Sequence, residues 1–211
     1  MQPVANKINY RSIILDVAER VILAALFGYF AFHMLGAWLE TGGTFNLLLL
    51  ISEGSVVVFA IMRRYTRDVS ARPLDWLFAF LGTLAPLLVL PSVGAALVPG
   101  VIFLPIMVIG LGLQIAAKLI LRRSFGVVAA NRGVKIAGPY RFVRHPMYAG
   151  YMLTQCGYLL ANPTAWNVGV YAFAWAFAYV RIVAEEKLLI QDSAYRQFTK
   201  EVRYRVIPGV I

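Results

Sequence analysis

The sequence predicts an all-α, polytopic integral membrane protein with about five to six membrane helices. Hydrophobic residues make up 60% of its 211 residues and charged residues only 14%, whereas soluble domains carry about 25% charged residues. Several apolar runs approach the roughly 20 residues that an α-helix needs to cross a bilayer. The lysines and arginines lie at alternate ends of these runs, which is typical of inserted membrane helices.

Six apolar segments follow one another along the chain, and each predicts a helix. The fifth is shorter than a full span and is joined to the sixth by Asn162-Pro163-Thr164. Asn-Pro favours a turn and Thr164 can cap the next helix, so we expect a closing helical hairpin that need not cross the bilayer completely. The segments are Ile13–Trp38, Phe45–Met62, Leu74–Leu90, Val98–Leu121, Met147–Ala161 and Ala165–Val180, the last with a charged helical continuation.

The basic residues predict the orientation of the chain in the membrane. Because the segments run back and forth across the membrane, these alternate ends all face the same side, and all 20 lysines and arginines can be assigned to them. The turns at 40–44, 91–98 and 162–164, on the opposite side, contain none. This positive-inside pattern predicts cytoplasmic N and C termini, in a multi-pass protein that we expect in a bacterial inner membrane. The net charge of +10 is then a topology signal with a secondary attraction to anionic lipids, and nucleic-acid binding is not expected.

We expect one structural domain with two functional parts. Residues 1–121 are predicted to form the transmembrane scaffold, and residues 122–211 hold nearly all the polar chemistry together with the hairpin. Cys156 is the only cysteine, so an intrachain disulfide is excluded. No His, Cys, Asp or Glu cluster has metal-ligand spacing, and we expect no metal site.

The first candidate site is the segment 138–150, which leads into the short fifth helix. Pro146 suits the first turn of that helix because its missing N–H would be unpaired there. The helix start offers free N–H groups and a partial positive charge, which can receive a ligand carboxylate. His145 and Tyr148 add hydrogen-bonding groups. The alternative is an interfacial belt, in which Arg, His and Tyr simply mark the membrane boundary.

The second candidate is the pair Glu185 and Glu186, at the predicted cytoplasmic end of the sixth helix. Acidic residues near a helix C-terminus oppose the macrodipole. Pairing of Glu185 with Arg181 on one helix face would explain them, as would a cationic ligand or a plain solvated helix end.

The third candidate is the tail 195–208, either an amphipathic helix on anionic lipid or a lid with an arginine directed at an anionic substrate group.

Three features lie inside the apolar segments. Glu53 is a functional candidate because ionisable residues at membrane depth are costly; a protonated or helix-paired carboxyl is the alternative. Gln114 could hydrogen-bond either a ligand or a neighbouring helix. The run 110–112, Gly-Leu-Gly, favours close helix packing over a dinucleotide fingerprint, which requires a preceding strand.

The string Arg144-His145-Pro146-x-Tyr148-x-Gly150, with a glutamate pair about 35 residues later, resembles the isoprenylcysteine carboxyl methyltransferase family. This broader group includes membrane phospholipid methyltransferases. Together with Gly138-Pro139-Tyr140, Tyr195 and Pro208, the resemblance covers about residues 118–208. It implies S-adenosylmethionine-dependent methyl transfer to a lipophilic acceptor that arrives from the bilayer, at a site open to the cytoplasm.

The resemblance also implies roles for individual residues. Cofactor contacts are expected from the string and the glutamate pair, to which Gln114 is added by its position. An arginine of the tail would face a substrate carboxylate, with Arg203 preferred to Arg205. The expected catalytic residues are Arg203, Glu186 and Tyr148, and the expected cofactor-binding residues are His145, Pro146, Tyr148, Gly150, Glu185, Glu186 and Gln114.

Two alternatives to a methyltransferase stay open. Membrane sterol reductases, which use NADPH, are similar in the same string, but a glutamate typically follows their glycine where this sequence has Tyr151. A non-catalytic membrane scaffold is the other alternative. The acceptor of a methyltransferase could be a carboxylate, a thiol or an amine.

Overall fold

The computed structural model describes residues 10–41, 44–63, 70, 72–90, 96–124, 126–128, 131 and 133–210. Within these ranges all regular secondary structure is helical, which confirms the predicted all-α class. The α-helices are α1 Tyr10–Thr41, α2 Thr44–Met62, α3 Pro73–Leu84, α4 Gly100–Leu121, α5 Pro146–Ala161, α6 Ala165–Leu189 and α7 Ser193–Glu201, with 3-10 turns η1 Ala85–Leu88, η2 Arg122–Ser124 and η3 Gly138–Arg141.

Three helices in the described part of the chain are long and apolar enough to cross a membrane. They are Ile13–Glu40, Gly100–Leu121 and Ala165–Leu189, and a shorter apolar stretch covers Pro73–Leu88. These helices support an integral membrane protein. The count of five to six membrane helices and the side on which the termini lie stay predictions. The alternating distribution of lysines and arginines also stays a prediction, and Lys7, Arg64, Arg67 and Arg132 lie outside the described residues.

The third apolar segment is not one continuous α-helix. It is α-helical only to Leu84 and continues as the 3-10 turn η1. Pro86 explains the change, because proline lacks a backbone donor and its ring clashes with the preceding turn. The sixth segment, in contrast, stays helical to Leu189, so its predicted charged continuation is confirmed.

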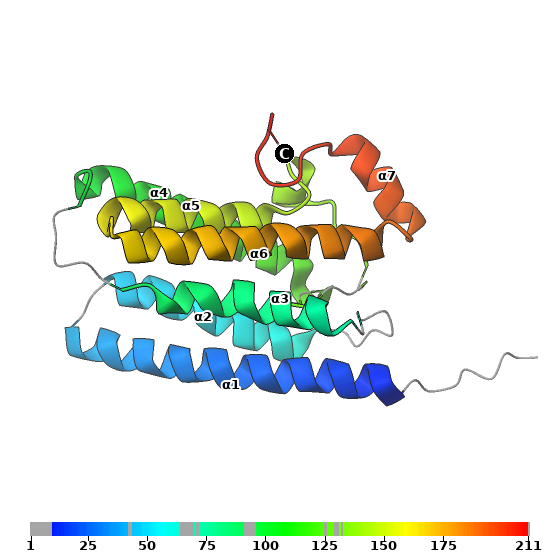
Figure 1. Ribbon diagram of the computed structural model, residues 1–211, viewed down its shortest axis with the longest axis horizontal. Helices are drawn as coiled ribbons and strands as arrows, with labels where there is room; N and C mark the ends of the chain where they lie inside the picture. The colour runs from blue at the N-terminus through cyan, green and yellow to red at the C-terminus, as the bar shows by residue number, and fades with distance from the viewer. Residues whose placement is uncertain are drawn as a thin grey trace, which may run out of the picture.

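The helices lie alongside one another in pairs (Figure 1), with α4 packed on α5, α1 on α2 and α3 on α6. The α4–α5 contact depends on glycine. A Cβ added at Gly110 would lie 2.6 Å from the backbone nitrogen of Thr154, and one added at Gly150 would lie 2.7 Å from the carbonyl oxygen of Gly110. The prediction that Gly110 serves close packing is confirmed, whereas a Cβ added at Gly112 would meet no atom of another segment within 4 Å.

The turn between α5 and α6 forms as the sequence predicts. Thr164 is the N-cap of α6, and its Oγ1 accepts a hydrogen bond from the backbone N–H of Asn167 at 3.1 Å. Asn167 is fully buried and holds both backbone groups of Leu90, accepting from its N–H at 2.9 Å and donating to its carbonyl at 2.8 Å. The hairpin is therefore fixed to the chain that follows η1.

The polar residues gather at the opposite end of the helices. Helix α7 and the C-terminal tail lie at this end (Figure 1), beside the start of α5 and the end of α6. The start of α5, the end of α6 with its glutamate pair, and the C-terminal tail, which carry the candidate site residues, therefore meet at one end of the molecule.

Candidate active site

The start of α5 is held against the C-terminal tail by backbone hydrogen bonds. The N–H of Arg144 donates to the carbonyl of Tyr204 at 2.9 Å, and the N–H of His145 donates to that of Arg205 at 2.7 Å. Pro146 occupies the first turn of α5 and is fully buried, as predicted from its sequence position. These contacts bring residues 60 positions apart into one site.

Glu186 is the carboxylate around which this end is organised. Its Oε1 accepts from Arg144 Nε at 2.8 Å and lies 3.2 Å from His145 Nε2, and its Oε2 accepts from Arg205 Nε at 2.8 Å. Its side chain is only 13% exposed, so these partners replace most of its water. Charge-assisted hydrogen bonds of this kind are the strong ones, and they join α6, the start of α5 and the tail.

Two buried tyrosines, Tyr195 and Tyr140, lie within reach of the charges of the glutamate pair. The hydroxyl of Tyr195, on α7, donates to Glu186 Oε1 at 3.5 Å. Burial raises the pKa of Tyr195 well above its ordinary value, and the charges of Glu186 and Glu185 raise it further. Burial likewise raises the pKa of Tyr140, with a smaller contribution from Glu185. Both phenols therefore stay protonated at neutral pH, and that of Tyr195 donates to the carboxylate.

Glu185 is the freer member of the acidic pair. Its side chain is 35% exposed, and its Oε2 lies 4.0 Å from His145 Nδ1. An ion pair with Arg181, one of the three alternatives for Glu185, does not form among the described side chains, because Arg181 donates to Thr83 Oγ1 at 2.8 Å and to the carbonyl of Val127 at 3.1 Å. The guanidinium of Arg181 also lies over the ring of Tyr148, 5.3 Å from its centroid.

A cavity of about 750 Å³, its open mouth included, lies over these groups. Glu185 is its carboxylate, Lys135 and Arg144 are its basic side chains, and the rest of the wall is mostly apolar or aromatic. The lining residues are Leu121, Ser124, Gly126, Val127, Val128, Gly133, Val134, Lys135, Tyr140, Arg144, His145, Met147, Tyr148, Glu185, Leu189, Tyr195 and Phe198.

The structure brings some of the predicted site residues together at this cavity. His145, Tyr148 and Glu185 line it, and Glu186 lies behind them, bound to His145 and Arg144. The aromatic ring of Tyr148 meets that of His145 edge to face, with centroids 5.8 Å apart.

Other predicted site residues lie elsewhere. Gln114 is buried and its Nε2 donates to Thr154 Oγ1 at 2.9 Å, so it joins α4 to α5 rather than lining the cavity. Gly150 likewise packs against α4, where its neighbours are Gly110 and Gln114. Arg203, the preferred tail arginine, is exposed, whereas Arg205 reaches Glu186. The side chain of Glu53 lies outside the described residues.

Several cavity residues were not predicted as site residues from the sequence. Arg144 belongs to the conspicuous Arg-His-Pro string, and its neighbour His145 was selected, so the string itself contained the signal. Lys135 and Val127 precede the string in a stretch without recognisable spacing, and only the folded chain brings them near α6. No group of three His, Cys, Asp or Glu side chains that could hold a metal occurs among the residues described.

Residues 93–191 match the family model described as the isoprenylcysteine carboxyl methyltransferase (ICMT) family, which confirms the resemblance noted from the motifs. The match extends through α4, α5 and α6, and it leaves α1 to α3, α7 and the tail outside. No curated protein matches the chain. The match supports an enzyme of the methyltransferase class with a lipophilic membrane substrate.

Proposed function

We propose that this protein, whose residues 93–191 belong to an isoprenylcysteine carboxyl methyltransferase-like family, transfers a methyl group from S-adenosylmethionine to a lipophilic acceptor. The acceptor is a carboxylate, a thiol or an amine that enters from the bilayer. The site opens on the cytoplasmic side of a bacterial inner membrane. The observation that carries the proposal is the cavity at the start of α5, with Glu185 and His145 in its wall and Glu186 fixed behind them.

The side chains at the cavity fit the chemistry of this cofactor. S-adenosylmethionine bears an amino group and a sulfonium, ribose hydroxyls and a carboxylate. Glu185 is partly exposed and can accept hydrogen bonds from the amino or hydroxyl groups and balance positive charge. Lys135, Arg144 and the N-terminus of α5 offer positive potential for a carboxylate.

When bound, S-adenosylmethionine supplies an electrophilic methyl group on a positively charged sulfur. The chain must hold the acceptor in line with that group and exclude water from the pocket. Buried Tyr148 and Met147 make part of the wall dry. For a carboxylate or thiolate acceptor, a tail arginine holds the anion, and Arg205 is nearer the cluster than Arg203. For an amine acceptor, Glu185 accepts the proton.

The proposal is tested by calorimetric titration of detergent-purified protein with S-adenosylhomocysteine, and separately with NADPH. We expect micromolar binding of S-adenosylhomocysteine and none of NADPH. Binding of NADPH alone would move the protein to the reductase alternative. Binding of neither ligand by protein shown to be folded would favour a non-catalytic scaffold.

Two variants test whether the cavity is the binding site. Glu185→Gln and His145→Ala are both expected to weaken S-adenosylhomocysteine binding, because each removes a polar group from the wall. The matched control is Glu201→Gln, the same change of charge at an exposed position of α7 outside the cavity lining. Unchanged affinity in both cavity variants would refute the site assignment.

A further inference from the structure

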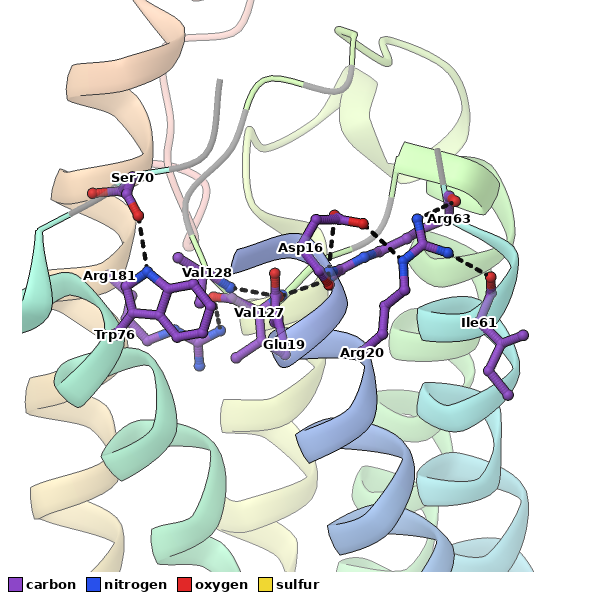
Figure 2. Close-up of polar contacts among 10 residues, drawn as sticks. All are labelled: Asp16, Glu19, Arg20, Ile61, Arg63, Ser70, Trp76, Val127, Val128 and Arg181. Carbon is purple, nitrogen blue, oxygen red and sulfur yellow. Dashed lines mark hydrogen bonds and ion pairs between the residues drawn. The ribbon is translucent and has the colours of Figure 1, made fainter. Parts of the chain in front are cut away.

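Four charged side chains form a network at the start of α1. Arg63 Nη1 lies 2.8 Å from Glu19 Oε1 and Arg63 Nη2 lies 3.0 Å from Asp16 Oδ1, and Arg20 Nε donates to Asp16 Oδ2 at 2.8 Å. Asp16, Glu19 and Arg63 are at most 2% exposed. Two carboxylates and two guanidinium groups balance each other (Figure 2), which is the condition for burying charge.

Glu19 extends this network to the wall of the cavity. Its Oε1 accepts hydrogen bonds from the backbone N–H groups of Val127 at 2.7 Å and Val128 at 3.0 Å. Arg181 holds the same peptide from the other side, donating to the carbonyl of Val127 at 3.1 Å. Figure 2 shows Glu19 and Arg181 on either side of these two residues.

The peptides at Val127 and Val128 need such partners. Both residues are buried and belong to no helix, so their N–H groups lack the partners that a helix would supply. A buried backbone donor without a partner is costly. Both side chains line the cavity, so the carboxylate that satisfies their N–H groups also fixes the position of that wall.

We infer that Glu19 is a positioning residue of the ligand pocket, which holds the Val127–Val128 wall in place from α1. The inference rests on the proposed function for the identity of the ligand. Helix α1 lies outside the segment 93–191 that matches the family. The part of the chain predicted to be scaffold therefore contributes to the shape of the pocket, through a charged residue that its hydrophobic pattern does not reveal.

Amide hydrogen exchange of the native protein in detergent is the first test. The N–H groups of Val127 and Val128 should exchange slowly, because a hydrogen bond to a buried carboxylate protects them. In Glu19→Gln the carboxylate oxygen that accepts both bonds is replaced by a weaker, neutral amide acceptor and Arg63 loses its paired charge, so both N–H groups should exchange faster. Rapid exchange of both groups in the native protein would overturn the inference whether or not any variant folds.

Titration with S-adenosylhomocysteine supplies the functional readout. Glu19→Gln should weaken binding by about 10-fold to 100-fold, the effect expected of a small displacement in a ligand site. The matched control is Arg20→Gln, which removes a charge from the same network but contacts Asp16 and the carbonyls of Ile61 and Arg63 instead of the wall.

The control should retain native affinity even if its melting temperature falls. Equal loss of affinity in both variants would overturn the inference and assign the network a general role in folding. If the native protein binds no S-adenosylhomocysteine, the proposed function fails. The exchange of Val127 and Val128 in Glu19→Gln still decides whether Glu19 holds this wall.

Discussion

Arg205 donates a hydrogen bond from its Nε to Oε2 of Glu186 at 2.8 Å and so joins the C-terminal tail to the end of α6. The contact raises the pKa of Arg205 above its ordinary value, chiefly through the hydrogen bond to Glu186. The neighbouring backbone bonds, from Arg144 to Tyr204 and from His145 to Arg205, hold the same stretch of tail against the start of α5. The tail is thus part of the site.

The two tail arginines should differ in their effect on stability. Arg205→Ala removes a charge-assisted bond to a mostly buried carboxylate, and we expect the free energy of unfolding to fall by about 1 kcal/mol, because Arg205 is itself partly exposed. Arg203→Ala is the matched control at an exposed position, with an expected change within about 0.5 kcal/mol. Thermal unfolding in detergent measures both, and a larger loss in Arg203→Ala would contradict the assignment.

The two glutamates should separate stability from ligand binding. Glu186→Gln leaves Arg144 and Arg205 without their counter-charge, and breaking a buried ion pair from one side costs about 3 kcal/mol. Glu185→Gln should cost less than about 1 kcal/mol, because Glu185 is partly exposed and lies 4.0 Å from His145.

Denaturant unfolding measures these two stabilities, and hydrogen exchange of residues 202–206 reports whether the tail detaches in Glu186→Gln. The tail should open in that variant and stay closed in Glu185→Gln. Equal stability of the two variants would mean that the bonds to Glu186 contribute little.

The sequence predicts the elements of this fold better than it predicts the site. Hydrophobic runs and the Asn-Pro-Thr turn are local. Helices α4 and α5 begin and end close to their predicted bounds, and α6 begins at the predicted residue, Ala165. Local chemistry also explains Pro146 in the first turn of α5 and Thr164 as a cap. The end of α3 is less predictable. The apolar run continues to Leu90 and predicts a helix to that point, whereas Pro86 ends the α-helix at Leu84.

The site depends on contacts that no spacing reveals. Glu19 and Val127 are more than 100 residues apart and meet only because the first part of α1 lies beside the segment that follows α4. Arg203 and Arg205 are both basic residues of one tail, so their sequence positions do not show that Arg205 is the one that contacts Glu186. Gln114 has two interpretations, a ligand contact or a helix contact, whereas Gly150 is expected at the cofactor. The observed neighbours of both lie on facing helices.

Gly150 offers a direct test of helix packing. A Cβ at this position would lie 2.7 Å from the carbonyl oxygen of Gly110 and 2.8 Å from the backbone nitrogen of Gln114. Because backbone atoms cannot move aside cheaply, Gly150→Ala should destabilise the protein by about 1–3 kcal/mol.

The matched control for Gly150→Ala is Gly169→Ala, at an exposed position in α6 where an added Cβ would meet no atom of another segment within 4 Å. Alanine there should be neutral or stabilising by up to about 1 kcal/mol, since glycine is a poor helix former. Thermal unfolding of the two variants decides the matter. Equal melting temperatures would show that α4 and α5 do not approach as closely as described.

Asp192 should make the attachment of α7 sensitive to acid. Its carboxylate accepts from Asn131 Nδ2 at 3.0 Å and caps α7 through the N–H of Ala194 at 2.8 Å. The hydrogen bond from Asn131, and then that from Ala194, lower the pKa of Asp192 below its ordinary value of 3.8. A carboxyl whose pKa is lower in the folded state adds stability above its unfolded pKa and loses it as the pH falls through the folded value.

The loss should therefore occur below pH 3.8 and be absent at neutral pH. Hydrogen exchange of α7 between pH 3 and pH 6, corrected for the intrinsic pH dependence of exchange, should show α7 opening more readily at the acid end in the native protein. In Asp192→Asn, which cannot titrate, this additional opening should disappear, whereas the control Glu201→Gln should keep it. An identical acid response in the native protein and in Asp192→Asn would mean that another group controls the attachment of α7.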